Sequence, residues 1–106
     1  MNRQEFIKSI ENTYKLGVDI IKIKNADYAN SEDPFKNFRS SEIIGLSVEQ
    51  AILVRVLDKI TRISNLLSKE ADVKEESLED TITDCANYLA IMKAYRESTE
   101  KQEPVF

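Results

Sequence analysis

The chain has 106 residues, a net charge of −4, 32% charged and 42% hydrophobic residues, and only two glycines and two prolines. This length suits one domain, and the scarcity of turn formers favours an all-α fold and excludes a β-sandwich. The acidic balance disfavours polymeric nucleic acid as a partner, because phosphate backbones bind clusters of Lys and Arg. We therefore predict a single all-α domain over residues 1–106, with its core in 3–97 and a mobile tail over 98–106.

The sequence holds one cysteine, Cys85, and no histidine. An intramolecular disulfide, a Ser-His-Asp triad and a zinc site built from Cys and His are thereby excluded. Any metal needs oxygen ligands, which points to Mg²⁺, Mn²⁺ or Ca²⁺. The N-terminus has no apolar signal core and no segment has the roughly 20 apolar residues of a membrane span, so we expect a cytoplasmic protein.

From Arg3 to Lys24, apolar residues recur every three or four positions, which predicts an amphipathic helix. Its main face holds Phe6, Ile7, Ile10, Tyr14, Val18 and Ile21, and a second line on the opposite side holds Leu16, Ile20 and Ile23. The second line indicates either deeper burial within one chain or a subunit interface. Three helices alone make a thin core at this length, so we expect a homo-oligomer, a dimer or a tetramer.

Residues 25–46 are rich in turn formers, and Pro34 forbids a regular helix across them. We expect an ordered loop of about twenty residues, with a short helix at Ser40–Ile44. Its aromatic side chains either stack on a base whose edge is read by nearby amides and acids, or pin the loop to the core. The candidate nucleotide-binding residues here are Lys24, Asn25, Asp27, Tyr28, Asp33, Phe35, Asn37 and Phe38.

Ser47-Val48-Glu49-Gln50 fits a capping box, which predicts a second helix from there to about Ser68. Its apolar face holds Val48, Ile52, Leu53, Val56, Ile60, Ile63, Leu66 and Leu67. The other side carries Arg55, Asp58, Lys59 and Arg62. That cluster indicates either an ordinary ladder of ion pairs, or a metal ligand, Asp58, beside cations that hold phosphate.

A third helix is predicted to begin at a cap, Asp72 or Ser77, and to end near Tyr95 or Glu97. It carries an acidic stripe beside its apolar face, formed by Glu76, Asp80 and Asp84 with Asn87 close in line. Like charges four residues apart repel, so a divalent cation would stabilise them. The alternative is a solvated acidic face near the helix N-terminus. Glu49 lies in the first turn of the preceding helix, where it either interacts favourably with the helix dipole or acts as a further metal ligand.

Four blocks of the chain together resemble a known family. They are Lys24-Asn25-x-Asp27-Tyr28, Asp33-Pro34-Phe35-x-Asn37-Phe38, Arg55-x-x-Asp58-Lys59-x-x-Arg62 and Glu76-Ser77-x-x-Asp80-Thr81-x-x-Asp84-x-x-Asn87-Tyr88. This series resembles the phage-associated nucleotide modification associated domain 1 family, which is similar to the MazG-like all-α nucleoside triphosphate pyrophosphatases. The resemblance covers most of the chain and implies a small helical bundle with a nucleotide pocket roofed by the loop.

The resemblance also implies roles for individual residues. It implies a site for Mg²⁺ or Mn²⁺ formed by Asp58, Glu76 and Asp80, with Asp84 or Glu49 as a further ligand. On this basis we expect Arg55, Lys59 or Arg62 to neutralise phosphate, and Asp84 or Glu49 to orient the attacking water. We expect the loop residues and Asn87 to contact the nucleotide. The MazG-like pattern has Glu-x-x-Glu and Glu-x-x-Asp, where this chain has Arg55-x-x-Asp58 and Glu76-x-x-x-Asp80. One acid is missing or moved, and hydrolysis needs enough charge to hold metal and activate water.

The sequence thus predicts a cytoplasmic, phage-encoded, Mg²⁺-dependent nucleotide-binding protein that acts as a pyrophosphohydrolase on a nucleoside triphosphate or a modified nucleotide. The first alternative is a non-catalytic protein that sequesters a nucleotide or assists a DNA-modifying enzyme. The second is a helical interaction module that presents Leu16, Ile20 and Ile23 to a protein partner.

Overall fold

The computed structural model describes residues 1–27, 32–69 and 77–100, and every regular element in these ranges is helical. In chain order the elements are α1 (Arg3–Asp27), α2 (Lys36–Arg39), the 3₁₀ helix η1 (Ser40–Ile44), α3 (Val48–Lys69) and α4 (Leu78–Glu100). The all-α prediction is confirmed. None of the described helices has the combination of length and apolarity that crossing a membrane requires.

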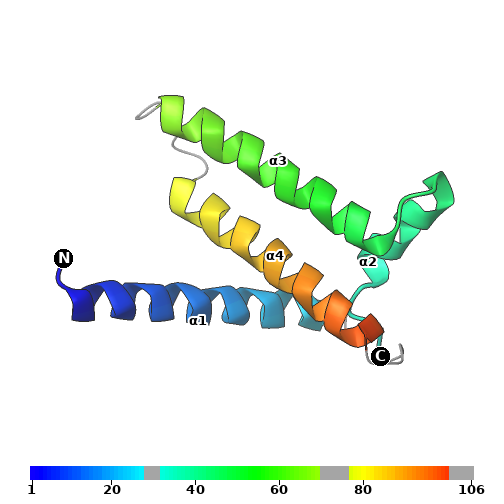
Figure 1. The fold of residues 1–106 in the computed structure, drawn as a ribbon, viewed down its shortest axis with the longest axis horizontal. Helices are drawn as coiled ribbons and strands as arrows, with labels where there is room; N and C mark the ends of the chain where they lie inside the picture. The colour runs from blue at the N-terminus through cyan, green and yellow to red at the C-terminus, as the bar shows by residue number, and fades with distance from the viewer. Residues whose placement is uncertain (28–31, 70–76, 101–106) are drawn as a thin grey trace.

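The three long helices form an open arrangement (Figure 1). The helices α3 and α4 lie side by side and antiparallel, while α1 contacts α4 and, among the described residues, makes no contact with α3. The N-terminal half of α1 extends past α4. The radius of gyration is 16.4 Å, against about 13 Å for a compact chain of 100 residues. The chain is therefore less compact than a domain of its length.

Side-chain caps begin all three long helices. At α3, the Ser47 hydroxyl accepts a hydrogen bond from the Gln50 amide (3.1 Å) while the Gln50 side chain accepts one from the Ser47 amide (2.9 Å), which confirms the predicted capping box. At α4, the Ser77 hydroxyl accepts from the Asp80 amide (3.0 Å), so Ser77 is the cap. The alternative cap, Asp72, lies outside the described residues.

The segment between α1 and α3 is more helical than its turn formers suggest. The first helix continues to Asp27, and α2 and η1 together occupy residues 36–44. The expected loop of about twenty residues is therefore wrong in length, whereas the short helix predicted at Ser40–Ile44 is confirmed as η1. Gly45 ends η1 with a φ of 82°, a conformation that costs other residues a steric penalty.

The last helix also runs further than predicted, because α4 ends at Glu100 and so includes residues 98–100 of the expected tail. Two ion pairs one turn apart, Lys93 with Glu97 (2.7 Å) and Arg96 with Glu100 (3.9 Å), support its last turns. The Ser98 hydroxyl also donates to the Tyr95 carbonyl (2.7 Å). Residues 101–106 lie outside the described part of the chain.

The apolar core is small and sits where α2 meets the first turns of α3. Phe35, Val48 and Ile52 are buried there, and the partly buried side chains packed against them are Phe38, Tyr88, Ile91, Met92 and Tyr95. Three of the residues predicted for the apolar face of α3 or its flank stay exposed, namely Leu53, Ile60 and Leu67, as does Leu57. The core therefore uses only part of the apolar surface that the sequence provides.

The helix α1 buries little of either of its apolar lines. Phe6, Ile7, Ile10, Tyr14 and Val18 of the main line and Leu16 and Ile23 of the second line are all exposed. Deeper burial within one chain, which was one interpretation of the second line, is therefore not found for Leu16 and Ile23. Among residues 3–25 of this helix, the buried position is instead Gly17.

Gly17 marks the crossing of α1 over α4. The Asn87 side-chain amide donates a hydrogen bond to the Gly17 carbonyl (3.2 Å), and a Cβ added at Gly17 would lie 2.6 Å from the Asn87 side-chain oxygen. The other close atoms also belong to Asn87. The absence of a side chain at Gly17 thus lets the two helices approach closely enough for this hydrogen bond.

The crossing predicts that Gly17→Ala changes the free energy of unfolding in opposite directions in the natural sequence and in an Asn87→Ala variant. Gly17→Ala in the natural sequence should lower the free energy of unfolding by about 1 kcal/mol, because the new methyl displaces Asn87 and breaks its hydrogen bond. In an Asn87→Ala background the space is open, so the same change should stabilise the protein by up to about 1 kcal/mol, since Ala favours helix over Gly. Urea unfolding of the four proteins at one concentration measures both effects. The same sign in both backgrounds would contradict the packing described.

Candidate functional site

A cleft of about 730 Å³ lies between the C-terminal end of α1, the segment around α2, and the α3/α4 pair. The described residues that line it are Ile21, Lys24, Asn25, Glu32, Asp33, Pro34, Lys36, Asn37, Phe38, Arg55, Tyr88 and Ile91. Small-molecule sites usually have volumes of about 300–1,000 Å³. The cleft is therefore large enough for a nucleotide.

Six predicted site residues meet in this cleft although the sequence separates them widely. They are Lys24 and Asn25 from α1, Asp33 before α2, Asn37 and Phe38 from α2, and Arg55 from α3. Lys36 and Tyr88 also line it and were not predicted as ligand contacts. The sequence could have indicated Lys36 by its position between the candidates Phe35 and Asn37, and Tyr88 by its position next to the candidate Asn87.

The charge of the lining favours an anion. Lys24, Lys36 and Arg55 are all exposed, and none of the described carboxylates lies within ion-pairing distance of them. Of the two acids in the lining, Asp33 is paired with Arg39, which leaves Glu32 opposed to three cations. An anionic ligand would reduce this mutual repulsion of positive charge.

Aromatic contacts attach the α2 segment to α4. The Phe35 ring packs edge-on against Tyr95 with centroids 5.1 Å apart, and Phe38 packs edge-on against Tyr88 at 6.3 Å. Phe35 is buried in the core and is not among the residues that line the cleft. It therefore anchors the segment, which was the alternative interpretation, whereas the half-buried Phe38 both anchors the segment and faces the cleft.

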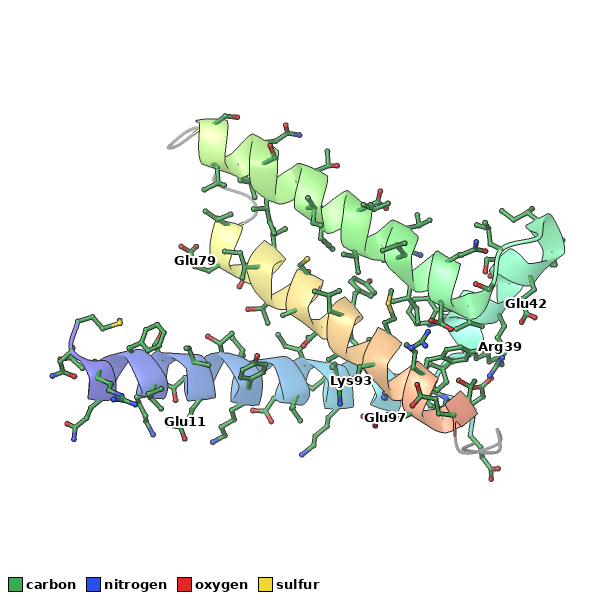
Figure 2. All side chains as sticks on the ribbon, in the orientation of Figure 1. Glu11, Arg39, Glu42, Glu79, Lys93 and Glu97 are labelled. Carbon is green, nitrogen blue, oxygen red and sulfur yellow. The ribbon has the colours of Figure 1, made fainter. Side chains whose placement is uncertain are left out.

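Asp33 holds the start of this segment in place. Its carboxylate accepts hydrogen bonds from the Phe35 amide (3.0 Å) and from the Arg39 guanidinium, which uses both Nε and Nη2. The Arg39 hydrogen bond, followed by that from the Phe35 amide, lowers the pKa of Asp33 below its ordinary value of 3.8. Figure 2 shows Arg39 beside the last turns of α4. Asp33 thus orders the wall that carries Lys36, Asn37 and Phe38.

A second hollow of about 440 Å³ adjoins the cleft. It shares Asn37, Phe38 and Arg55 with the cleft and adds Asp58, which lies one turn beyond Arg55 on α3. Arg62 lies about 10 Å further along α3 from Arg55 and is not among the described residues that line either hollow. Asp58 and Arg55 therefore present one acid and one cation at the boundary of the two hollows.

The other predicted acids serve as ion-pair partners between helices. Asp84 pairs with Lys59 of α3 (3.3 Å), and both side chains are largely covered. Glu49 pairs with Arg96 of α4 (2.7 Å). Arg96 is about 18 Å along the α4 axis from Asp84, so Glu49 and Asp84 cannot orient one water within a single chain. The catalytic role stays a prediction, and it can belong to Asp84 or to Glu49 but not to both.

The predicted metal ligands are described only in part. Asp58 and Asp80 are exposed on α3 and α4, and Glu76 lies outside the described residues. Within ranges 1–27, 32–69 and 77–100, no three His, Cys, Asp or Glu residues lie close enough together to hold a metal ion. The set of Asp58, Glu76 and Asp80 stays a prediction.

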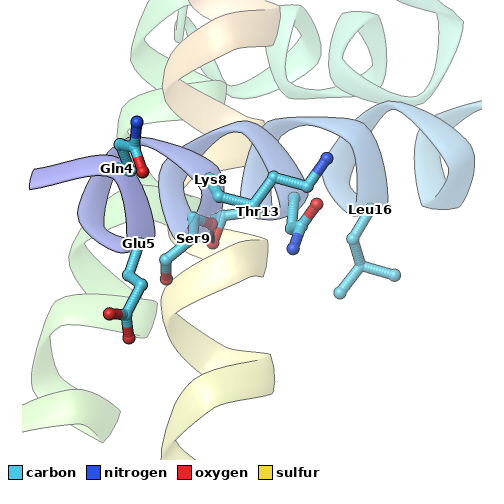
Figure 3. A pocket seen from close by; sticks show the side chains of 7 residues that line it. Gln4, Glu5, Lys8, Ser9, Thr13 and Leu16 are labelled. Atoms are coloured by element: carbon cyan, nitrogen blue, oxygen red, sulfur yellow. Dashed lines mark hydrogen bonds between the residues drawn. The ribbon is translucent and has the colours of Figure 1, made fainter. Parts of the chain in front are cut away.

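Three further candidates are not among the described residues that line the cleft. Asn87 is hydrogen-bonded to the Gly17 carbonyl and so serves the α1–α4 crossing. Asp27 ends α1, and nothing of its side chain is described; Tyr28 lies outside the described residues. A third hollow of about 640 Å³ runs along α1, and Figure 3 shows side chains of that helix around it. All its described lining residues come from α1, and no predicted site residue is among them.

Comparisons with known protein families, with curated proteins and with solved structures found no match for this chain.

The Asp33 contacts predict a pH effect with a defined sign. Because the pKa of Asp33 is lower in the folded chain than in the unfolded chain, its stabilising contribution is complete above pH 3.8 and is lost as the pH falls through the lowered value. Carboxyl-carbon NMR should give an Asp33 midpoint below 3.8, and Arg39→Gln should raise it. Lys36→Gln removes the same charge nearby without breaking a contact to the carboxylate, so it should leave the midpoint almost unchanged. An unmoved midpoint in Arg39→Gln would refute the assignment.

Proposed function

We propose that this protein binds a nucleotide in the cleft between α1, α2 and the α3/α4 pair. The observation that carries the proposal is the cationic lining of a nucleotide-sized cleft, with Lys24, Lys36 and Arg55 around it and Phe38 in its wall. Phosphate groups carry the negative charge that such a lining binds, and guanidinium groups bind phosphate oxygens through two hydrogen bonds. The ligand is therefore a phosphorylated nucleotide rather than a nucleoside.

The remaining lining suits the base. Phe38 and Tyr88 offer aromatic surfaces, and the amides of Asn25 and Asn37 offer donors and acceptors for the edge of a base. Asn25 and Asn37 are both exposed, so these groups are accessible to a ligand. The same walls thus supply stacking and hydrogen bonding, while the cations hold the phosphates.

A divalent cation enters this proposal with the phosphates. Mg²⁺ commonly binds to proteins through one or two carboxylates together with substrate phosphates and water. Asp58, which lies one turn from Arg55 in the adjoining hollow, is the predicted metal ligand that would share such a cation. Mn²⁺ has the same preference for oxygen ligands. In this proposal the protein acts in the cytoplasm as a Mg²⁺-dependent pyrophosphohydrolase of a nucleoside triphosphate or modified nucleotide.

A non-catalytic binder is the second candidate, and one observation favours it. Asp84, which the hydrolytic hypothesis gives to the attacking water, is paired with Lys59 and largely covered. A general base must reach the proton that it removes. The cleft can bind and retain a nucleotide whether or not this carboxylate becomes available.

We propose further that the protein is a homo-oligomer. The supporting facts are the radius of gyration of 16.4 Å and the small core around Phe35, Val48 and Ile52. Chains of this size bury a smaller fraction of their surface than larger domains, and association is a common compensation.

Calorimetry with Mg²⁺ and a panel of ribo- and deoxyribonucleoside triphosphates, including modified bases, tests the binding proposal. At least one should bind, and Arg55→Gln should weaken its binding by about tenfold or more, because a charge-assisted hydrogen bond contributes about 1.5–3 kcal/mol. Arg3→Gln is the matched control. It removes the same charge at the other end of α1, about 30 Å along that helix from the cleft residue Lys24, so this variant should bind normally. Absence of binding throughout the panel would refute nucleotide binding.

Product analysis of the same mixtures separates the two candidates. Pyrophosphate released together with a nucleoside monophosphate supports hydrolysis, and nucleotide recovered intact supports the non-catalytic binder. Tight binding that Arg55→Gln leaves unchanged would place the ligand outside this cleft.

A further inference from the structure

An apolar face lies on the α3/α4 pair away from the cleft. On α3, Leu53, Ile60 and Leu67 recur every seven residues with Leu57 beside them, and on α4 Ile82 and Leu89 recur at the same interval. Residues seven apart lie on one side of a helix. Each of these six side chains is 45–64% exposed. Two adjacent helices thus carry unburied apolar lines.

The two lines border the same side of the helix pair. Glu49 lies one turn before Leu53, and Arg96 lies seven residues after Leu89, so each belongs to one of the lines. Their ion pair of 2.7 Å joins the ends of the two lines. The cleft residues Arg55 and Ile91 belong to the other flanks of α3 and α4. The apolar lines therefore form one continuous face.

The accessible surface area of the chain is larger than that of a compact monomer of its mass. The accessible area is 8693 Å², whereas a compact protein of this mass exposes about 6,100 Å². A stable dimer hides about 800 Å² on each partner. The difference of roughly 2,600 Å² leaves ample area for an interface on a face shared by two helices.

The charges beside the apolar line of α4 are self-complementary. Ala86 is exposed on this flank, and Glu79 and Lys93 lie seven residues before and after it. Figure 2 shows Glu79 near one end of α4 and Lys93 toward the other. If two copies of α4 pair antiparallel about Ala86, Lys93 of each copy lies opposite Glu79 of the other. A two-fold axis makes this contact twice.

The same axis suits α3. The antiparallel helices α3 and α4 are set in register by the Lys59–Asp84 ion pair, which places Leu57 at the level of Ala86. Leu53 and Ile60 lie one turn on either side of Leu57. An axis through Ala86 therefore also passes the centre of the exposed α3 line, so one symmetry operation buries both lines.

We infer that a second copy of this chain covers this face, with α3 and α4 of each copy forming an antiparallel four-helix bundle. The inference rests on the proposed self-association and is independent of nucleotide binding. The exposed line of α1 is a weaker surface, because it belongs to a single helix. Burying the α3/α4 face adds an apolar core on the side of the helix pair opposite the cleft.

Sedimentation velocity of the full chain tests the face with matched variants. Leu89→Asp should raise the dimer Kd about 100-fold or more, because it places a carboxylate in an apolar interface. Leu16→Asp changes the same residue type at almost the same exposure, 49% against 50%, on α1, and Ile7→Asp tests the other line of α1. Both should remain dimeric, with circular dichroism confirming the helical content of each variant.

A charge exchange tests the symmetry and does not depend on a disruptive variant. Glu79→Lys and Lys93→Glu should each raise the dimer Kd several-fold through like-charge contacts, and the double variant should restore it. Both Lys93→Glu and the double variant lose the intrahelical pair with Glu97, so that loss cannot produce the restoration. A monomeric natural chain would overturn both self-association and this face. Dissociation by Leu16→Asp or Ile7→Asp, with Leu89→Asp still dimeric, would overturn the face alone.

Discussion

The contact between α3 and α4 is the interaction on which the rest of the structure depends. Of the described residues, the two that are fully buried belong to these helices, Ile52 to α3 and Thr81 to α4. The core with Phe35 and Val48 lies at one end of the pair. The side chains of Phe38, Tyr88 and Ile91 pack against that core and also line the cleft. The cleft wall is therefore the outer surface of the core, so the packing that stabilises the fold also positions the candidate site.

Periodicity and capping predicted the helices because both are local properties. Alternation every three or four residues identified α1, α3 and α4, and Ser47 with Gln50 marked the start of α3. The errors occurred where local signals were weak. Around Pro34 the turn formers concealed α2, although the short helix that follows it was predicted. The end of α4 is supported by pairs such as Lys93 with Glu97 rather than by apolar residues. Ion pairs between residues one turn apart change a helix prediction based on residue propensity very little, yet they stabilise the turns in which they form.

The candidate site was less predictable, since its residues meet only through packing between helices. The sequence singled out Lys24 and Asn37 in one segment and Arg55 in another, and the fold brings all three to one cleft. Spacing could not assign partners to the acids. Asp84 belongs to the acidic stripe of α4, yet its ion-pair partner is Lys59 on α3. Asn87, in line with the same stripe, donates a hydrogen bond to the Gly17 carbonyl of α1. The periodicity of one helix cannot reveal which side chains a neighbouring helix places opposite it.

The two proposed surfaces use opposite flanks of the α3/α4 pair. Arg55 and Asp58 of α3 border the cleft, while Leu57, between them in sequence, centres the inferred two-fold contact. In the antiparallel bundle the two clefts lie on the outer sides, and no described cleft residue belongs to the interface. Direct contact therefore cannot couple one nucleotide site to the other. Association acts on the cleft only through α3 and α4, whose packing on both flanks would restrict the positions of Arg55 and Tyr88 before a ligand binds.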